Sequence, residues 1–113
     1  MMVIMTDILL VFCTFPDIEK ARQIGTLLVE SQHAACVNLC PSMESIYRWQ
    51  GKVESTTEVL AIFKTAAERH EALKVRLQEL HPYEVPEIVA VKSEAVNEAY
   101  ARWVGECITA ANS

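Results

Sequence analysis

The sequence has few of the residues that interrupt regular structure. Its 113 residues include three glycines and four prolines, and 51% of them are apolar. This composition disfavours disorder and low complexity, and the length is sufficient to bury one hydrophobic core. We therefore expect a single folded domain over residues 1–113.

Long apolar runs and targeting signals are also missing. The longest apolar run, Ile8 to Cys13, is far shorter than the ~18 residues that a membrane helix needs. Residues 1–7 contain no Lys or Arg and end in an aspartate, which is unlike a secretory signal. The net charge of −5 disfavours nucleic-acid binding, which needs a basic face. We expect a cytoplasmic protein with reduced cysteines that binds neither membranes nor nucleic acids.

The sequence lacks the common catalytic motifs. It has no P-loop, no G-x-G-x-x-G, no G-x-S-x-G and no H-E-x-x-H. We therefore predict no catalytic residues and no enzyme activity. Cys36-x3-Cys40 lies on an extended segment, where four residues span about 13 Å. Two ligands of one zinc ion lie within about 4 Å of each other, so we interpret these cysteines as small buried apolar residues.

The most regular pattern in the chain runs from Cys36 to Thr65. Two segments of alternating residue type, typical of strands, meet at Gln50-Gly51, and the glycine tolerates the positive φ of a tight turn. Each arm has roughly 13–15 residues, whereas a usual strand has about 5–6. Such a hairpin leaves unpaired edges beyond the sheet of a small domain. We therefore expect further copies of the chain to pair with it.

The remaining elements are predicted from the periodicity of the apolar residues and from the positions of capping residues and prolines. We expect a strand over Ile8–Cys13, a helix to about Gln32 capped by Thr14 or Asp17, and a bend, bulge or edge at Pro41. Thr65-Ala66-Ala67-Glu68 predicts a capping box for a helix that ends at His81. A strand over 86–91 and a helix through residues 96–107 complete the chain. The order predicts a ferredoxin-like α+β sandwich, βαββαβ, with an additional C-terminal helix.

The segment 81–87, His-Pro-Tyr-Glu-Val-Pro-Glu, concentrates reactive side chains. Its two prolines reduce the entropy cost of holding a ligand. A rigid connector with solvated polar groups is an equally good interpretation. Cys13 is either a buried core thiol or, with His81, half of a metal site. Cysteine and histidine suit copper or zinc, and a further ligand would have to come from elsewhere.

Several blocks of the sequence together resemble one known family. A-A-C-V-N, S-I-Y-R-W-Q-G-K-V, E-V-L-A-I-F-K-T and H-P-Y-E-V-P-E-I closely resemble the CutA family of divalent-cation tolerance proteins, over about residues 7–107. The resemblance implies a homotrimer in which the long hairpin strands continue into neighbours. It also implies binding of copper or other divalent ions and a role in the response to metal ions. The ligands implied are Cys13 and two adjacent histidines, of which His81 matches the second and Leu80 replaces the first.

The same resemblance implies an inter-subunit pocket made by recurrent polar and aromatic positions: Cys36, Tyr47, Trp49, Glu58, Lys64, Tyr83, Glu84 and Glu87. Interface packing and buried ion pairs are an alternative role for these residues. Glu58 and Lys64 share a strand face but lie roughly 20 Å apart, so each needs a partner elsewhere. The leading function is therefore a metal-binding trimer. A small-molecule-sensing signal-transduction trimer and a protein-interaction scaffold are the alternatives.

Overall fold

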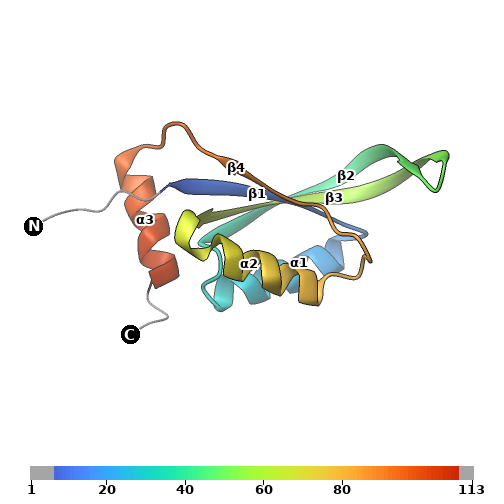
Figure 1. The fold of residues 1–113 in the computed structure, drawn as a ribbon. Helices are drawn as coiled ribbons and strands as arrows, with labels where there is room; N and C mark the ends of the chain where they lie inside the picture. Colours follow the sequence, from blue (N-terminus) through green and yellow to red (C-terminus); the bar gives the residue numbers. More distant parts are fainter. Residues whose placement is uncertain (1–6, 110–113) are drawn as a thin grey trace, which may run out of the picture.

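An antiparallel sheet with the strand order β2-β3-β1-β4 carries the fold. The computed structural model describes residues 7–109, and Figure 1 shows their arrangement. The elements are β1 (Ile8–Phe15), α1 (Ile18–Glu30), β2 (Cys36–Trp49), β3 (Lys52–Ala66), α2 (Ala67–Leu80), β4 (Ile88–Lys92) and α3 (Glu98–Thr109). This order confirms the predicted ferredoxin-like βαββαβ sandwich with an additional C-terminal helix.

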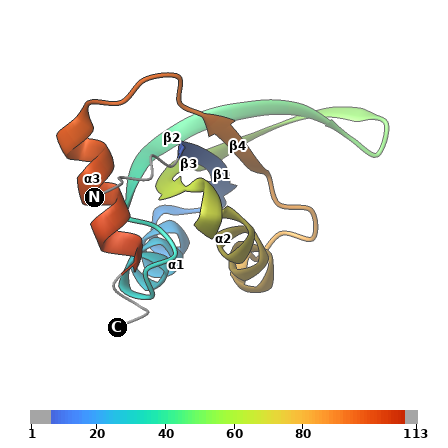
Figure 2. The ribbon, with the colours of Figure 1, turned by 60° about the vertical axis from the view of Figure 1, so that its left-hand side comes forward.

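Helices α1 and α2 cover one face of the sheet, and neither covers the other face (Figure 2). The core between them is built by inward-facing residues of β1 and β3 and by the apolar stripes of both helices: Val11, Cys13, Phe15, Ile24, Leu28, Phe63, Leu73 and Leu77. Alternation along each strand leaves every second residue on the face that α1 and α2 do not cover.

Helix α3 lies at the end of the sheet where β1 begins (Figure 1). Its buried residues Val104 and Ile108 pack with Ile8 and Ala66 in a second, smaller cluster. No helix within residues 7–109 has the length and apolar character needed to cross a membrane.

The two helices on the sheet begin in different ways. The carboxylate of Asp17 accepts a 2.7 Å hydrogen bond from the backbone N–H of Lys20, so Asp17, not Thr14, caps α1. The predicted capping box of α2 is wrong, because its N-cap is Ala66, which makes no side-chain cap bond. Strand β3 continues to Ala66, and the buried hydroxyl of Thr65 instead donates to the carbonyl of His33 at 2.8 Å.

The hairpin turns where the sequence predicted it. Gln50 and Gly51 have φ values of 51° and 80°, as a two-residue turn with two left-handed residues requires. A register shift between Cys40 and Met43 confirms the irregularity expected at Pro41. Cys40 is exposed and Cys36 is only partly buried, so their interpretation as buried apolar residues is wrong. Their backbone lies on the edge strand β2, where one side of the strand has no neighbour within the described residues.

The hairpin extends well beyond the rest of the sheet. The last residue pair between β1 and β3 joins Phe15 to Val59, and residues 52–58 of β3 pair only with β2. The described chain measures 56 × 27 × 21 Å, and the hairpin tip projects along the long axis (Figure 1). The tip exposes apolar side chains: Ile46 is 70% exposed and Val53 is 69% exposed.

Candidate functional site

The connection from α2 to β4 is anchored to the end of β1 by His81. Its Nε2 lies 2.7 Å from the carbonyl oxygen of Thr14, and its Nδ1 lies 3.0 Å from the backbone N–H of Tyr83. A carbonyl only accepts and an N–H only donates, so these contacts select the neutral imidazole with its proton on Nε2. The ring stacks on Phe15 at 4.7 Å, and burial lowers the pKa of His81.

Tyr83 carries this connection across to the open face of the sheet. Its hydroxyl donates a 2.7 Å hydrogen bond to Oε2 of Glu58, and its ring lies 4.8 Å from that of His81. Glu58 is 8% exposed, which is unusual for a carboxylate. Burial, followed by the bond to Glu58, raises the pKa of the Tyr83 hydroxyl far above its ordinary value. Tyr83 is therefore a persistent donor at neutral pH.

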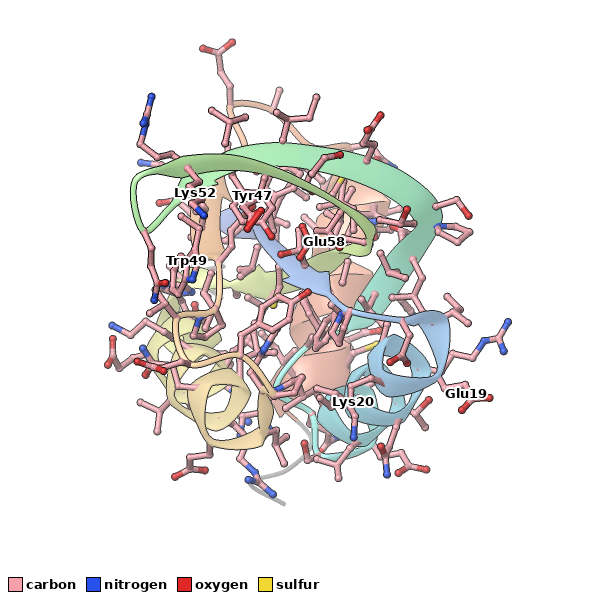
Figure 3. All side chains as sticks on the ribbon, turned by 90° about the vertical axis from the view of Figure 1, so that its right-hand side faces the viewer. Glu19, Lys20, Tyr47, Trp49, Lys52 and Glu58 are labelled. Carbon is pink, nitrogen blue, oxygen red and sulfur yellow. The ribbon has the colours of Figure 1, made fainter. Side chains whose placement is uncertain are left out.

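Glu58 and Tyr83 both line a cleft of about 830 Å³ between the hairpin and the 82–87 connection. The cleft brings together six of the eight residues predicted for a pocket: Tyr47, Trp49, Glu58, Tyr83, Glu84 and Glu87. Figure 3 looks onto this end of the molecule, where Tyr47 and Glu58 lie beneath the arch of β2 and β3 and Trp49 lies to one side. Three carboxylates and three aromatic rings thus line one cavity.

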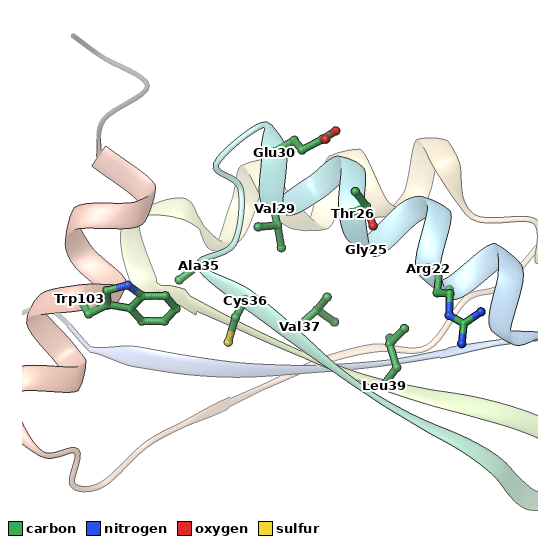
Figure 4. A pocket seen from close by; sticks show the side chains of 11 residues that line it. Arg22, Gly25, Thr26, Val29, Glu30, Ala35, Cys36, Val37, Leu39 and Trp103 are labelled. Carbon is green, nitrogen blue, oxygen red and sulfur yellow. The ribbon is translucent and has the colours of Figure 1, made fainter.

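The structure places Cys36 and Lys64 outside this cleft. Cys36 lies at the start of β2, where its Sγ is 3.5 Å from the hydroxyl of Tyr100, a contact that raises the pKa of Tyr100 to about 12. Cys36 lines a different groove of about 510 Å³ between α1, β2 and Trp103 (Figure 4). The ammonium of Lys64 donates to Oδ1 of Asn38 on β2. Glu58 and Lys64 therefore each find a partner on another element, as their spacing predicted.

Sequence reasoning missed several lining residues of the cleft, among them Thr14, Ser45, Thr56, Pro82 and Val85. The strand pattern contained a signal for two of them. Ser45 is two residues from Tyr47, Thr56 is two residues from Glu58, and Ser45 and Thr56 are paired in the register. The period of two places all four on the same face of the hairpin. Thr14 and Pro82 carry no such local signal, because the fold alone brings them together.

Comparison with known proteins identifies the family. The family model described as CutA1 divalent ion tolerance protein matches residues 9–107. The chain belongs to the CutA1 family. The divalent-cation tolerance protein CutA of Thermus thermophilus is 47% identical over 96 residues, which cover 85% of this chain and 93% of that protein. The CutA homolog of Xenopus laevis is 41% identical over 97 residues, and the chain spans 64% of its length.

Solved CutA structures share the fold. The crystal structure of CutA from Xylella fastidiosa is 41% identical, has a TM-score of 0.88, and the match covers 91% of this chain and 99% of that one. The resemblance noted in the sequence is thereby confirmed. CutA1 is a family of divalent-ion tolerance proteins and is not a known family of enzymes.

The two metal ligands implied by the CutA resemblance are both occupied by other interactions. Strand β1 continues past Cys13 to Phe15, so Cys13 does not end the strand as expected. Its thiol is fully buried in the core, and burial, with smaller contributions from Glu87 and Glu58, raises its pKa to about 12. Leu80, at the position of the family's first histidine, packs against the same core.

A preformed metal site needs several ligand atoms that converge on one point. Within residues 7–109, no three His, Cys, Asp or Glu side chains are placed to share an ion. Both nitrogens of His81 are hydrogen-bonded, and the thiol of Cys13 is protonated at neutral pH. In this arrangement the two side chains do not form a copper site.

Proposed function

We propose that this CutA1-family chain serves divalent-cation tolerance as a non-enzymatic cytoplasmic homotrimer that binds copper or other divalent ions. Family membership supports the role in tolerance. The observation that carries the proposal for assembly is the unpaired length of the β2–β3 hairpin. Each arm extends past the end of β1, and its outer backbone groups have no strand partner within residues 7–109.

The open face of the sheet supports the same assembly. Register pairs place apolar residues of β1, β3 and β4 side by side on the face that α1 and α2 do not cover: Leu10, Phe12, Leu60, Ile62, Val89 and Val91. Val89 is 51% exposed and Val91 is 45% exposed in the single chain. A contiguous apolar face of this kind marks an interaction surface. Packing three such faces together would bury them.

Sedimentation equilibrium at low micromolar concentration tests the assembly. We expect about three times the subunit mass of 12.7 kDa. A monomer at this concentration would contradict the proposal. Tolerance is tested separately, by expressing the chain in a host that lacks its own CutA and measuring growth at raised copper. Growth that stays as poor as that of the empty host would contradict the role.

For copper, we propose Cys13 and His81 as the protein ligands, completed by water or by a carboxylate of a neighbouring copy. Soft and borderline donors favour copper over zinc. Binding would require the His81 ring to release a hydrogen bond and the buried thiol to release its proton. We therefore expect weak binding, measured by calorimetric titration of tag-free protein with copper and then with zinc.

The cleft beside the hairpin favours a second candidate function, the binding of a small metabolite by a signal-transducing trimer. Its volume of about 830 Å³ lies within the range of small-molecule sites, about 300–1,000 Å³. A thermal-shift screen tests this candidate, because a ligand that binds only the native state raises the apparent stability. A screen without a single stabilising compound would contradict it.

A further inference from the structure

The cleft between the hairpin and the 82–87 connection has an unusual combination of linings. Three carboxylates, those of Glu58, Glu84 and Glu87, accompany the aromatic rings of Tyr47, Trp49 and Tyr83, and the lining includes no Lys, Arg or His. An anionic ligand such as a nucleotide would meet three like charges and no compensating cation. A cationic ligand would meet the opposite charge and the negative faces of aromatic rings.

Glu58 adds a second, independent observation. Its side chain is more than nine-tenths buried, yet no salt bridge to it occurs among residues 7–109. The donor it does have is the neutral hydroxyl of Tyr83, which binds one of its two carboxylate oxygens. Burying an ionised carboxylate costs several kcal/mol unless a cation accompanies it. The wall of the cleft therefore contains a negative charge without its counter-charge.

A metal ion does not fit this charge. A divalent cation needs several oxygen ligands that converge at about 2.0–2.6 Å, and within residues 7–109 no three acidic, histidine or cysteine side chains are so placed. The three carboxylates come from β3 and from the 82–87 connection, and aromatic and apolar residues line the cleft with them. Trp49 and Tyr47 are 47% and 42% exposed in the single chain. An ammonium group on an apolar skeleton matches both features.

The hairpin itself offers two basic residues on the face that carries Glu58. One is Lys64, which donates to Asn38, and the other is Lys52, which is opposite Trp49 in the register. In Figure 3 Lys52 and Trp49 lie toward one side of the arch, whereas Glu58 lies nearer its middle. Lys52 makes no salt bridge among the described residues. Lys52 therefore does not neutralise the charge of Glu58.

We propose that this cleft is a binding site for a small organic cation, an alkylammonium whose charge pairs with Glu58 and lies against Tyr47 and Trp49. The proposal rests on the small-molecule function proposed above and narrows its ligand to one charge class. It does not depend on copper. The apolar skeleton of the ligand would contact Pro82 and Val85 at the other wall of the cleft.

Three probes with the same carbon skeleton test the charge class: 3,3-dimethylbutylammonium, 3,3-dimethylbutan-1-ol and 3,3-dimethylbutanoate. The protein is used as purified, in a Trp103→Phe background, so that Trp49 is the only tryptophan and reports on the cleft. We expect the cation to change Trp49 fluorescence at concentrations about tenfold lower than the alcohol, and the anion to bind least. The cation's affinity should fall as salt increases.

Glu58→Gln tests the residue that carries the proposal. The amide keeps an oxygen that can accept from Tyr83 but removes the charge. We expect about a tenfold loss of affinity for the cation and an unchanged affinity for the alcohol. Glu44→Gln is the matched control, because Glu44 lies on the opposite face of the same hairpin and bonds Ser55. Tyr47→Leu, which keeps the Trp49 reporter and whose folding is checked by its melting curve, should also weaken binding of the cation and leave binding of the alcohol unchanged.

Each result has a defined meaning. Equal affinities for all three probes would overturn the charge class and leave a small-molecule site intact. An unchanged cation affinity in a folded Glu58→Gln protein would overturn the role of Glu58. Failure of all three probes to bind would overturn the site.

Discussion

The hydroxyl of Tyr83 donates a 2.7 Å hydrogen bond to the carboxylate of Glu58, and this bond joins the connection after α2 to the open face of β3. A bond to a charged, buried acceptor contributes more than an ordinary one. We expect Tyr83→Phe to lower the free energy of unfolding by about 1.5–3 kcal/mol, toward the lower end because Tyr83 is partly exposed.

Tyr47→Phe is the control for this prediction. The same oxygen is removed from the same cleft, but the described structure gives the Tyr47 hydroxyl no hydrogen bond, so we expect a change within about 0.5 kcal/mol. Urea unfolding of both variants at one protein concentration is the measurement, since the stability of an oligomer depends on concentration. Equal losses in the two variants would mean that the Tyr83–Glu58 bond contributes nothing.

Because the thiol of Cys13 is buried, we expect the free energy of unfolding to fall in alkaline solution. Its pKa is raised by burial from 9.0 to about 12, so the folded protein keeps a proton that the unfolded chain releases. The stabilisation is therefore complete below pH 9 and is lost as the pH rises from 9 to 12. We expect Cys13→Ala to show a shallower fall of unfolding free energy over this interval than the parent. Tyr83 and Tyr100 also have raised pKa values, and they remain in both proteins. Parallel curves would place the Cys13 thiol in contact with solvent.

We expect the aromatic residues of the hairpin to contribute to assembly. Tyr47 and Trp49 are 42% and 47% exposed in the single chain. If a neighbouring copy covers them, truncation to alanine removes a packed ring at a cost of roughly 3–5 kcal/mol. We expect Tyr47→Ala and Trp49→Ala to lower the thermal midpoint and to shift sedimentation toward smaller species. Val75→Ala, at a 43% exposed position on α2, is the control and should leave both unchanged. Unchanged midpoints in both aromatic variants would place the rings in solvent.

The sequence predicted those features whose causes are local. The turn at Gln50-Gly51 follows from the need for positive φ, and the cap of α1 follows from an aspartate at the right spacing. The capping box at Thr65 failed because a long-range pairing of Ile8 with Ala66 extends β3 through this position. At Thr65 the strand pairing and the hydrogen bond to the carbonyl of His33 therefore replace the predicted helix cap.

The candidate site, too, is predicted in part by a local pattern, and its other part follows only from the fold. The alternation along the hairpin predicts that Tyr47, Trp49 and Glu58 share a face. Only the fold shows that the 82–87 connection crosses to that face and brings Tyr83 to Glu58. Likewise, the apolar run around Cys13 is compatible with a core thiol or an edge ligand. The continuation of β1 to Phe15 and the cover of α1 and α2 place the thiol in the core.

Copper supplies the last prediction. If Cys13 and His81 are the ligands, Cys13→Ser and His81→Ala should each reduce copper affinity. Leu80→His, which restores the family's pair of histidines, should increase it.

Affinity should also fall in acid, because the thiol and the imidazole must both lose protons to bind the metal. Burial already lowers the pKa of His81, so its neutral form is available at pH 7 and the thiol presents the larger barrier. Calorimetric titration of the four proteins at pH 6 and pH 8 makes the comparison. His33→Ala is the control, since His33 bonds Ser31 in the turn after α1. Equal affinities across all of these proteins would mean that Cys13 is only a core thiol and that His81 serves only to anchor the connection to Thr14.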